Sequence, residues 1–381
     1  MGKEDIVMTR RNSSSEIKRR NKSAVLRQMI RMGETTKPEL AVALRLSLPT
    51  VGQIVEELIK AGYVEETGRA ASVGGRRPVS VRVAPGKWRA LGIDITAHHM
   101  GFAIVDLAEG VVAHERFYAL FSVGKESRAK LRSEAERFLA QNGVGKDDLL
   151  GVGISLPGIV SVDQRSLLVS HALRVTEPME LIGDKCFPCP VRYFNDATAA
   201  CMVECYADDA PDSFFFLSLS NTVGGAIVIH KQIVEGDNNR SGELGHICVV
   251  PGGRRCYCGQ AGHYDAYGAA WLLAEKAGGD LAKFFELVEQ GDGEAAAAFD
   301  EYLDMLAMLL CNTIMVSDLP VILGGYVGNY LKPYLPKLKQ KVANLDIFGQ
   351  DDPNIRICRR KEEAAATGGA MYFLEQRIES L

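Results

Sequence analysis

Two segments of the chain repeat the same order of strand and helix patterns, and this repetition limits the folds that the sequence can adopt. The first segment has three strand-like runs within 91–118, a helical stretch over 126–141 and an apolar run over 149–154. The second has three strand-like runs within 214–234, then helices, then the apolar run 321–325. Two copies of a β-β-β-α-β unit predict an α/β body with two lobes and a ligand cleft between them.

The N-terminal part has a different pattern, with the apolar spacing of three helices. The first is expected from Ser23 to Gly33, the second over 37–44 with Pro38 in its first turn, and the third after Ser47. The second and third helices are short and closely joined, which predicts a helix-turn-helix whose second helix enters the major groove. The side chains expected to face DNA here are Arg45, Ser47, Thr50 and Gln53.

A β-hairpin wing is expected directly after these helices. Strand-like residues over 63–66 and 79–83 flank a Gly-rich tip with Arg76 and Arg77, which suit contact with phosphate or the minor groove. Residues 1–90 hold 18 Lys and Arg against 9 Asp and Glu, so a basic head precedes an acidic body. A helix pair in a protein-interaction module would have the same apolar spacing. The basic charge and the wing together favour DNA.

Length and composition limit the class of protein further. With 381 residues, 47% of them hydrophobic, the chain is long enough for two or three domains. It has no uninterrupted apolar run of about 18 residues and begins with polar and basic residues, so we expect neither a membrane span nor a secretory signal. Its 9 cysteines, an odd number, suit reduced thiols better than a disulfide framework. We therefore expect a cytoplasmic protein.

The glycine-rich loop 242–265 collects residues that bind metals. No helix or strand period runs through it, and it offers two imidazoles and two thiolates. Four such ligands with no open position are typical of a structural Zn²⁺ rather than a catalytic one. The alternative is a chance grouping in a chain with 9 Cys and 7 His. The expected ligands are His246, Cys256, Cys258 and His263.

The same loop resembles a known family. The runs 242–246 and 256–265 closely resemble the signature of the ROK family, which groups sugar kinases with sugar-responsive repressors. The family usually has a cysteine at His263 and a glutamate at Asp265, and both changes keep the chemistry of the position. The resemblance covers nearly the whole chain from Ser23 onward. It implies a winged helix-turn-helix followed by a two-lobed α/β domain of the actin-like ATPase type, ribonuclease-H-like as in hexokinases. It also implies a sugar site at Asn195, Asp196, Glu243, His246 and Asp265.

Asp196 has two explanations. It follows the strand-like run 191–195 and precedes a helix, and strand ends beside a cleft are where open α/β sheets bind ligands. In ROK sugar kinases the matching aspartate is the general base that takes a proton from the sugar hydroxyl. Asp is also favoured as a helix cap, and both roles can hold at once. Residues 156–160 resemble a family segment that borders the sugar, although a Pro-Gly turn without a ligand is equally ordinary.

The loops that hold ATP phosphates in ROK kinases are altered in this chain. The family loop after the first strand is Asp-x-Gly-Gly-Thr-Lys, whereas residues 94–99 read Asp-Ile-Thr-Ala-His-His. Both glycines and the lysine are replaced, although the backbone must approach the phosphates closely there. The second phosphate loop, over 220–226, also departs from the family pattern. We therefore predict a sensor rather than an enzyme, with Asp196 as the base if kinase activity persists.

These observations predict a sequence-specific DNA-binding regulator, a repressor of carbohydrate metabolism genes, that senses a sugar or sugar phosphate. In the repressor branch of the family, dimers bind near-palindromic operators, so we expect double-stranded operator DNA as a partner and a homodimer or a dimer of dimers. Two alternatives stay open: an ATP-dependent sugar kinase with a DNA-binding domain, and a repressor regulated by a partner protein. The expected domains are a flexible basic arm (1–22), a winged helix-turn-helix (23–86), a first lobe (87–205) and a second lobe with the zinc loop and C-terminal helices (206–381).

Overall fold

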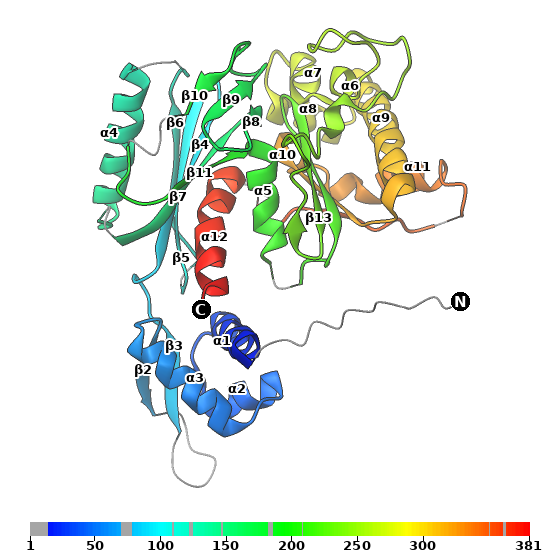
Figure 1. The fold of residues 1–381 in the computed structure, drawn as a ribbon. Coiled ribbons are helices and arrows are strands. Elements are labelled where there is room, and N and C mark those ends of the chain that lie inside the picture. The colour runs from blue at the N-terminus through cyan, green and yellow to red at the C-terminus, as the bar shows by residue number, and fades with distance from the viewer. Residues whose placement is uncertain are drawn as a thin grey trace, which may run out of the picture. The chain divides into compact units, whose positions relative to one another are not determined.

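The computed structural model describes residues 14–69, 78–108, 110–121, 125–145, 148–181, 186–207, 209–349, 351–360 and 363–381 (Figure 1). The chain divides into two compact units. The smaller consists of residues 1–89, 105–112 and 373–381, and the larger of residues 90–104 and 113–372. No helix among the described residues has both the length and the apolar character that crossing a membrane requires.

The smaller unit contains a winged helix-turn-helix. Its helices are α1 (Ser14–Met32), α2 (Lys37–Leu44) and α3 (Leu48–Lys60), and its strands are β1 (Thr35–Thr36), β2 (Val64–Arg69) and β3 (Val79–Val83). The strands form an antiparallel sheet in the order β1-β3-β2. Helix α1 begins at Ser14 rather than near Ser23, so residues 14–22 of the expected basic arm are helical.

Local side-chain chemistry explains the bounds of α2 and α3. Thr36 and Glu39 form a capping box, in which each side chain accepts a hydrogen bond from the backbone of the other. Arg45 ends α2 in the left-handed conformation, at φ 53°. Ser47 caps α3 by accepting a hydrogen bond from the backbone N–H of Thr50. Helix α2 therefore has the predicted bounds, and α3 begins directly after Ser47, as the sequence predicted.

The larger unit has two lobes, each built on a five-stranded sheet. The first sheet has the order β11-β7-β4-β5-β6 and the second β14-β13-β12-β15-β16. The strands of each lobe can be numbered from one to five along the chain. Read from β11 in the first sheet and from β16 in the second, both sheets then have the order fifth, fourth, first, second, third. This shared order confirms the duplication that the sequence predicted. The strands are β4 (Arg89–Ile95), β5 (His99–Asp106), β6 (Gly110–Tyr118), β7 (Leu149–Leu156), β11 (Val191–Asn195), β12 (Phe214–Leu219), β13 (Val223–Ile229), β14 (Gln232–Ile233), β15 (Val321–Gly324) and β16 (Ile355–Ile357).

Each lobe has its own hydrophobic core and its own helices. A small sheet of β8 (Ile159–Val160), β9 (Ser166–Val169) and β10 (Met179–Glu180) extends the first lobe. Helix α4 (Lys125–Gln141) belongs to the first lobe, whereas α5 (Asp196–Cys205) follows β11 of the first lobe and packs on β12 and β13 of the second. The second lobe contains η3 (Leu244–His246), α6 (Asp265–Gly268), α7 (Ala270–Glu275), α8 (Leu281–Glu289), α9 (Gly293–Ser317), α10 (Gly325–Gly328), η4 (Lys332–Tyr334) and α11 (Leu335–Ala343).

The C-terminal helix α12 (Ala364–Glu379) has residues in both units. In the larger unit it packs closely on α5 (Figure 1), since a Cβ atom added at Gly368 would lie 1.8 Å from the carbonyl oxygen of Ala199. In the smaller unit Glu375 forms a 2.5 Å ion pair with Arg27 on α1. The small residues at the start of α12 thus permit a close contact that larger side chains would prevent.

Candidate functional site

A cavity of about 370 Å³ lies between the two lobes of the larger unit. This volume is within the range of small-molecule sites. The first lobe contributes residues near the ends of β7, β9 and β11, and the second contributes the loop before β13 and the loop that precedes η3. Its lining is Pro157, Gly158, Ile159, Val169, Ser170, His171, Ala172, Asn195, Asp196, Thr222, Val223, Gly224, Gly225, Arg240, Glu243, His246 and Tyr257.

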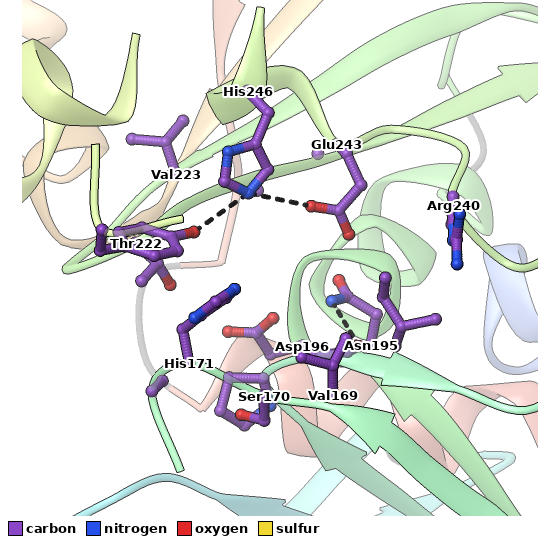
Figure 2. A pocket seen from close by; sticks show the side chains of 17 residues that line it. Val169, Ser170, His171, Asn195, Asp196, Thr222, Val223, Arg240, Glu243 and His246 are labelled. Carbon is purple, nitrogen blue, oxygen red and sulfur yellow. Dashed lines mark hydrogen bonds and ion pairs between the residues drawn. The ribbon is translucent and has the colours of Figure 1, made fainter. Parts of the chain in front are cut away.

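Four of the five residues predicted to bind sugar line this cavity. Figure 2 shows Asn195 and Asp196 on one side, and Glu243 and His246 facing them from the other. The fifth, Asp265, is buried and is not part of the lining that the structure describes. Its Oδ1 accepts a hydrogen bond of 3.1 Å from the backbone N–H of Val223, which does line the cavity. Asp265 therefore contributes to the pocket indirectly, by accepting a hydrogen bond from the backbone of the lining residue Val223.

Asn195 is the residue that caps helix α5. Its Oδ1 accepts hydrogen bonds from the backbone N–H groups of Ala197 and Thr198, at 2.9 and 3.3 Å. Its Nδ2 donates to the carbonyl oxygen of Gly158 at 3.1 Å, which ties the end of β11 to the turn after β7. The cap position thus belongs to Asn195, and Asp196 is the first residue of the helix.

Asp196 is not the cap residue, and its carboxyl group lines the cavity, where Oδ1 accepts a hydrogen bond of 3.0 Å from the backbone N–H of Ala197. Burial and, to a smaller extent, the neighbouring carboxyl of Asp94 together raise the pKa of Asp196 to about 7. Burial also raises the pKa of Glu243, an effect that Arg240 partly offsets. A carboxyl group with a pKa near neutrality, such as that of Asp196, can exchange a proton with a ligand hydroxyl or accept a hydrogen bond from it.

His246 has one ring nitrogen directed to each of two sites. Its Nδ1 lies 3.3 Å from Nδ1 of His263 and 3.9 Å from Sγ of Cys256. Its Nε2 lies 3.3 Å from the hydroxyl of Tyr257 and 3.9 Å from Oε2 of Glu243, on the cavity side (Figure 2). A metal ion on Nδ1 would leave Nε2 as an N–H donor at the pocket.

The side chains of the four predicted metal ligands form one cluster. One ligand atom from each of His246, Cys256, Cys258 and His263 lies within 4.8 Å of all the others. Bonds of about 2.05 Å to nitrogen and about 2.3 Å to sulfur at tetrahedral angles separate two nitrogens by about 3.3 Å and a nitrogen from a sulfur by about 3.5 Å. The pairs here measure 3.3 Å between the two imidazoles and 3.2 Å from Cys258 to His263. The donor set therefore fits a small tetrahedral cation.

The pocket also contains residues that the sequence analysis missed. His171 follows β9, and its ring lies 4.8 Å from that of Tyr257, so it closes the pocket on the side of the metal loop. Arg240 lies at the opposite edge (Figure 2), next to Asn239, whose Nδ2 donates to the carbonyl oxygen of Val160. Neither residue belongs to a repeated pattern or a known motif, so the sequence held no signal for them.

Of the residues predicted to face DNA, Gln53 and Arg45 are exposed, whereas Ser47 also caps a helix. Gln53 is exposed on α3, where its amide donates to Glu57 at 3.2 Å. Ser47 is exposed but caps α3, and its hydroxyl is 2.7 Å from that of Thr50. Arg45 is exposed at the turn between the helices. The predicted wing-tip residues Arg76 and Arg77 lie outside the described residues.

The segment that matches the first phosphate loop of kinases is a tight turn. The backbone N–H of His99 donates to Oγ1 of Thr96 at 3.0 Å, and the Thr96 hydroxyl donates to the carbonyl oxygen of His99 at 3.2 Å. Asp94, at the end of β4, accepts a hydrogen bond of 2.5 Å from the hydroxyl of Ser155. These backbone and carboxyl groups are thus committed to contacts within the protein.

Comparison with known sequences identifies the family. The sequence profile of the ROK family matches residues 90–377. The chain is a member of the ROK family. Within this ROK protein, residues 18–65 also match a profile described as winged helix-turn-helix DNA-binding. Both matches agree with the two folds described above.

Relatives of this ROK protein include named regulators. It is 26% identical over 261 residues to the xylose repressor of Bacillus subtilis, a match that covers 68% of this chain and 67% of the repressor. It is 25% identical over 265 residues to the DNA-binding transcriptional dual regulator NagC of Escherichia coli, covering 68% of this chain and 65% of NagC.

Solved structures show the same fold. A ROK family transcriptional regulator, described as a homologue of the E. coli MLC protein, matches with a TM-score of 0.75 at 20% identity, covering 95% of this chain and 97% of that one. A ROK family glucokinase from Streptomyces griseus matches with a TM-score of 0.64 at 22% identity, covering 74% of this chain and 98% of the kinase. The kinase fold thus corresponds to the ROK part, and the regulator fold to nearly the whole chain.

Proposed function

We propose that this ROK protein is a sequence-specific DNA-binding transcriptional regulator, a repressor of carbohydrate metabolism genes. The observation that carries the proposal is the combination, in one chain, of a winged helix-turn-helix and a two-lobed ROK domain with a polar pocket between its lobes. The relatives named xylose repressor and NagC support the same function.

The DNA-binding surface is formed by α3 and the residues that flank it. Thr50 and Gln53 on α3 contact base edges, and Arg45 at the preceding turn contacts phosphate. Ser47 contributes mainly by capping the helix whose N-terminal end enters the groove. Arg76 and Arg77, which the sequence predicts at the tip of the wing, add contacts to phosphate or to the minor groove.

The effector is a sugar or sugar phosphate held in the pocket between the lobes. The carboxyl groups of Asp196 and Glu243 accept hydrogen bonds from its hydroxyls, and His246 donates through Nε2. Asn195 and Asp265 shape the site by fixing the start of α5 and the backbone at Val223. Binding changes the angle between the lobes, and it affects DNA affinity only if the sugar binds the DNA-competent and DNA-incompetent states differently.

The metal site is structural and binds Zn²⁺ through His246, Cys256, Cys258 and His263. Two thiolates and two imidazoles at tetrahedral spacing leave no open position for a substrate. The ion would supply rigidity to the loop and would fix the tautomer of His246 that presents an N–H at the pocket. Glu243 and His246 would then keep their positions when no sugar is present.

The pocket binds sugar without phosphorylating it. Positions 96–99 carry side chains where a phosphate loop needs glycine, and the Thr96 hydroxyl closes this turn on His99. The alternative of a sugar kinase with a DNA-binding domain makes a clear prediction: ATP-dependent phosphorylation of a sugar that is lost in Asp196→Asn. Absence of any transfer from labelled ATP across a sugar panel supports the sensor.

The active form is a cytoplasmic homodimer on double-stranded operator DNA, and two such dimers can pair further. One winged helix-turn-helix has too small an interface for tight specific binding, so two copies are needed to read a near-palindromic site. The domain division that accompanies this proposal is the one expected from the sequence, except that residues 14–22 belong to α1 and extend the DNA-binding domain expected over 23–86.

Selection of bound DNA tests the function directly. Purified protein is mixed with sheared genomic DNA from its source, and the retained fragments are sequenced. Fragments upstream of genes for sugar uptake or breakdown support the proposal. Gel-shift titration of the selected site with a panel of free and phosphorylated sugars then tests the effector. If no sugar in the panel alters operator affinity, a partner protein becomes the better candidate, and release of DNA by sugar-free cell extract would support it.

A further inference from the structure

A cluster of charged side chains surrounds Asp94, the last residue but one of strand β4, whose carboxyl group neighbours that of Asp196 at the pocket. Arg116, on β6 of the first lobe, lies 3.9 Å from Oδ2 of Asp94 and 3.4 Å from Oε1 of Glu363. Its other terminal nitrogen donates to the hydroxyl of Tyr326 at 3.0 Å. Tyr326 lies on α10, directly after β15 of the second lobe, so the guanidinium group contacts both lobes.

The carboxyl groups on the first-lobe side of the cluster are mostly buried. The side chains of Asp94 and Glu363 are only 11% and 6% exposed. The carboxyl group of Glu363 lies against β5, because a Cβ atom added at Gly101 would lie 1.8 Å from Glu363 Oε2. Glycine at this position therefore makes room for the carboxylate. Two mostly buried carboxyl groups therefore form ion pairs with the guanidinium group of Arg116.

Charge also favours an ionised Arg116 in this position. Burial works to lower the pKa of Arg116, but Tyr326, Glu363 and Asp94 outweigh burial and raise it. Burial raises the pKa of Asp94, and the Ser155 hydroxyl and Arg116 partly offset that effect. Loss of Arg116 would remove the cation that acts on both carboxyl groups.

The second-lobe side of the cluster depends on one hydroxyl group. Tyr326 is on a four-residue helix, α10 (Gly325–Gly328), whose first residue has φ +79° and lies close to the backbone of Leu219 on β12. A Cβ atom added at Gly325 would lie 2.6 Å from the backbone nitrogen of Leu219. Helix α10 thus packs closely on the second sheet. The hydroxyl of Tyr326 accepts a hydrogen bond from Arg116 and so links α10 to the first lobe.

We propose that Arg116 and Tyr326 form a cross-lobe tether, in which Asp94 and Glu363 hold the guanidinium and the Tyr326 hydroxyl links it to the second lobe. The tether fixes the distance between the lobes when no ligand is bound, and it consists only of the protein's own side chains. It acts at the cleft itself and does not depend on the identity of any sugar. For the proposed sensor, it defines the ligand-free state from which an effector moves the lobes.

Hydrogen exchange on the ligand-free full-length protein tests the tether. Tyr326→Phe removes only the hydroxyl, and Arg116→Met removes the charge while keeping a side chain of similar length. Each variant is expected to speed amide exchange in segments 113–118 and 325–331 about five- to tenfold, the equivalent of one hydrogen bond to a charged group at a partly exposed site. The double variant is expected to exchange no faster than the more affected single variant, because both remove the same link.

Two substitutions serve as matched controls. Tyr330→Phe removes a hydroxyl from the same lobe, where the Tyr330 ring stacks on Phe285 with centroids 4.3 Å apart. Arg132→Met removes an exposed arginine that pairs with Glu136 on α4. Neither should change exchange in the two segments. The proposal is overturned if Tyr326→Phe behaves like Tyr330→Phe, if the effects of Arg116→Met and Tyr326→Phe add, or if exchange rises equally throughout the larger unit. These outcomes are independent of sugar and DNA binding, so they leave the proposed function untouched.

Discussion

The indole ring of Trp88 stacks on the ring of Tyr63, with centroids 4.3 Å apart and planes inclined by 15°. The guanidinium of Arg377 lies over both rings, 5.5 Å from the Tyr63 centroid and 4.9 Å from that of Trp88. Ser23 on α1 adds a hydrogen bond of 2.8 Å to the carbonyl oxygen of Ile378. The C-terminal end of α12 is therefore a structural part of the unit that contains the winged helix-turn-helix.

Replacing Trp88 should destabilise this smaller unit selectively. Trp88→Leu removes the ring stack and the cation–π contact, at a cost of about 1–2 kcal/mol. In differential scanning calorimetry the transition of the smaller unit should fall by about 4–8 °C. Trp271→Leu is the matched control, because Trp271 is 46% exposed on α7 of the larger unit. Equal shifts in the two variants would contradict a specific role for the stack.

Local signals in the sequence were sufficient to predict most elements of the fold. Capping residues and apolar spacing predicted the bounds of α2 and the start of α3. The repeated strand pattern predicted the duplication, which the shared strand order of the two sheets confirms. These signals are local because hydrogen bonds at helix ends and side-chain alternation in strands involve neighbours in the chain. The start of α1 was placed too late, since its first residues are polar and carry no apolar period.

Contacts between distant residues could not be predicted in the same way. The stack of Tyr63, Trp88 and Arg377 joins segments far apart in the chain, and nothing in the local sequence of any one of them indicates the others. The cap of α5 shows a subtler limit. Asn195 and Asp196 both suit a helix start, and only the conformation of the backbone decides that Asn195 caps the helix while Asp196 faces the cavity.

Gln53 should contribute to recognition of specific bases. It is exposed on α3, and an amide side chain can bind an adenine edge through two hydrogen bonds. Gln53→Ala should weaken binding to the selected operator by about 1–3 kcal/mol, with little change in affinity for unrelated DNA. Fluorescence anisotropy at fixed salt measures both affinities. Gln232→Ala on exposed β14 is the control. If specific and non-specific affinities fall together in Gln53→Ala, its contact is to phosphate rather than to a base.

Metal content should follow the four predicted ligands. Elemental analysis of the purified protein should find about one zinc ion per chain, as a tetrahedral Cys2His2 site requires. Cys258→Ser should lower the zinc content and the melting temperature of the larger unit, because the loop that carries Glu243 and His246 loses its bridge. Cys248→Ser is the matched control, since Cys248 is exposed on the same loop and is not one of the four clustered ligands. Full zinc content in Cys258→Ser would exclude this ligand set.

The raised pKa of Asp196 should make the stability of the larger unit depend on pH. Burial is the main cause of the raised value of about 7, followed by the charge of Asp94. An unfolded aspartate has a pKa of about 3.9, so the folded state binds the additional proton between about pH 4 and pH 7. The contribution of this carboxyl group to stability is therefore most favourable at low pH and falls as the pH rises towards 7.

Asp196→Asn should remove that dependence, because the amide stays neutral at every pH. We expect the variant to gain about 1–3 kcal/mol over the parent protein at pH 8 and to match it near pH 4, in ligand-free denaturant unfolding. Asp318→Asn is the control, because Asp318 is an exposed residue in the left-handed conformation that ends α9, where asparagine is well tolerated. A parallel pH profile for Asp196→Asn and the parent protein would mean that Asp196 is ionised at low cost in the empty pocket. In that case the carboxylate would already be charged before a sugar arrives, and sugar affinity should not change between pH 6 and pH 8 on account of this residue.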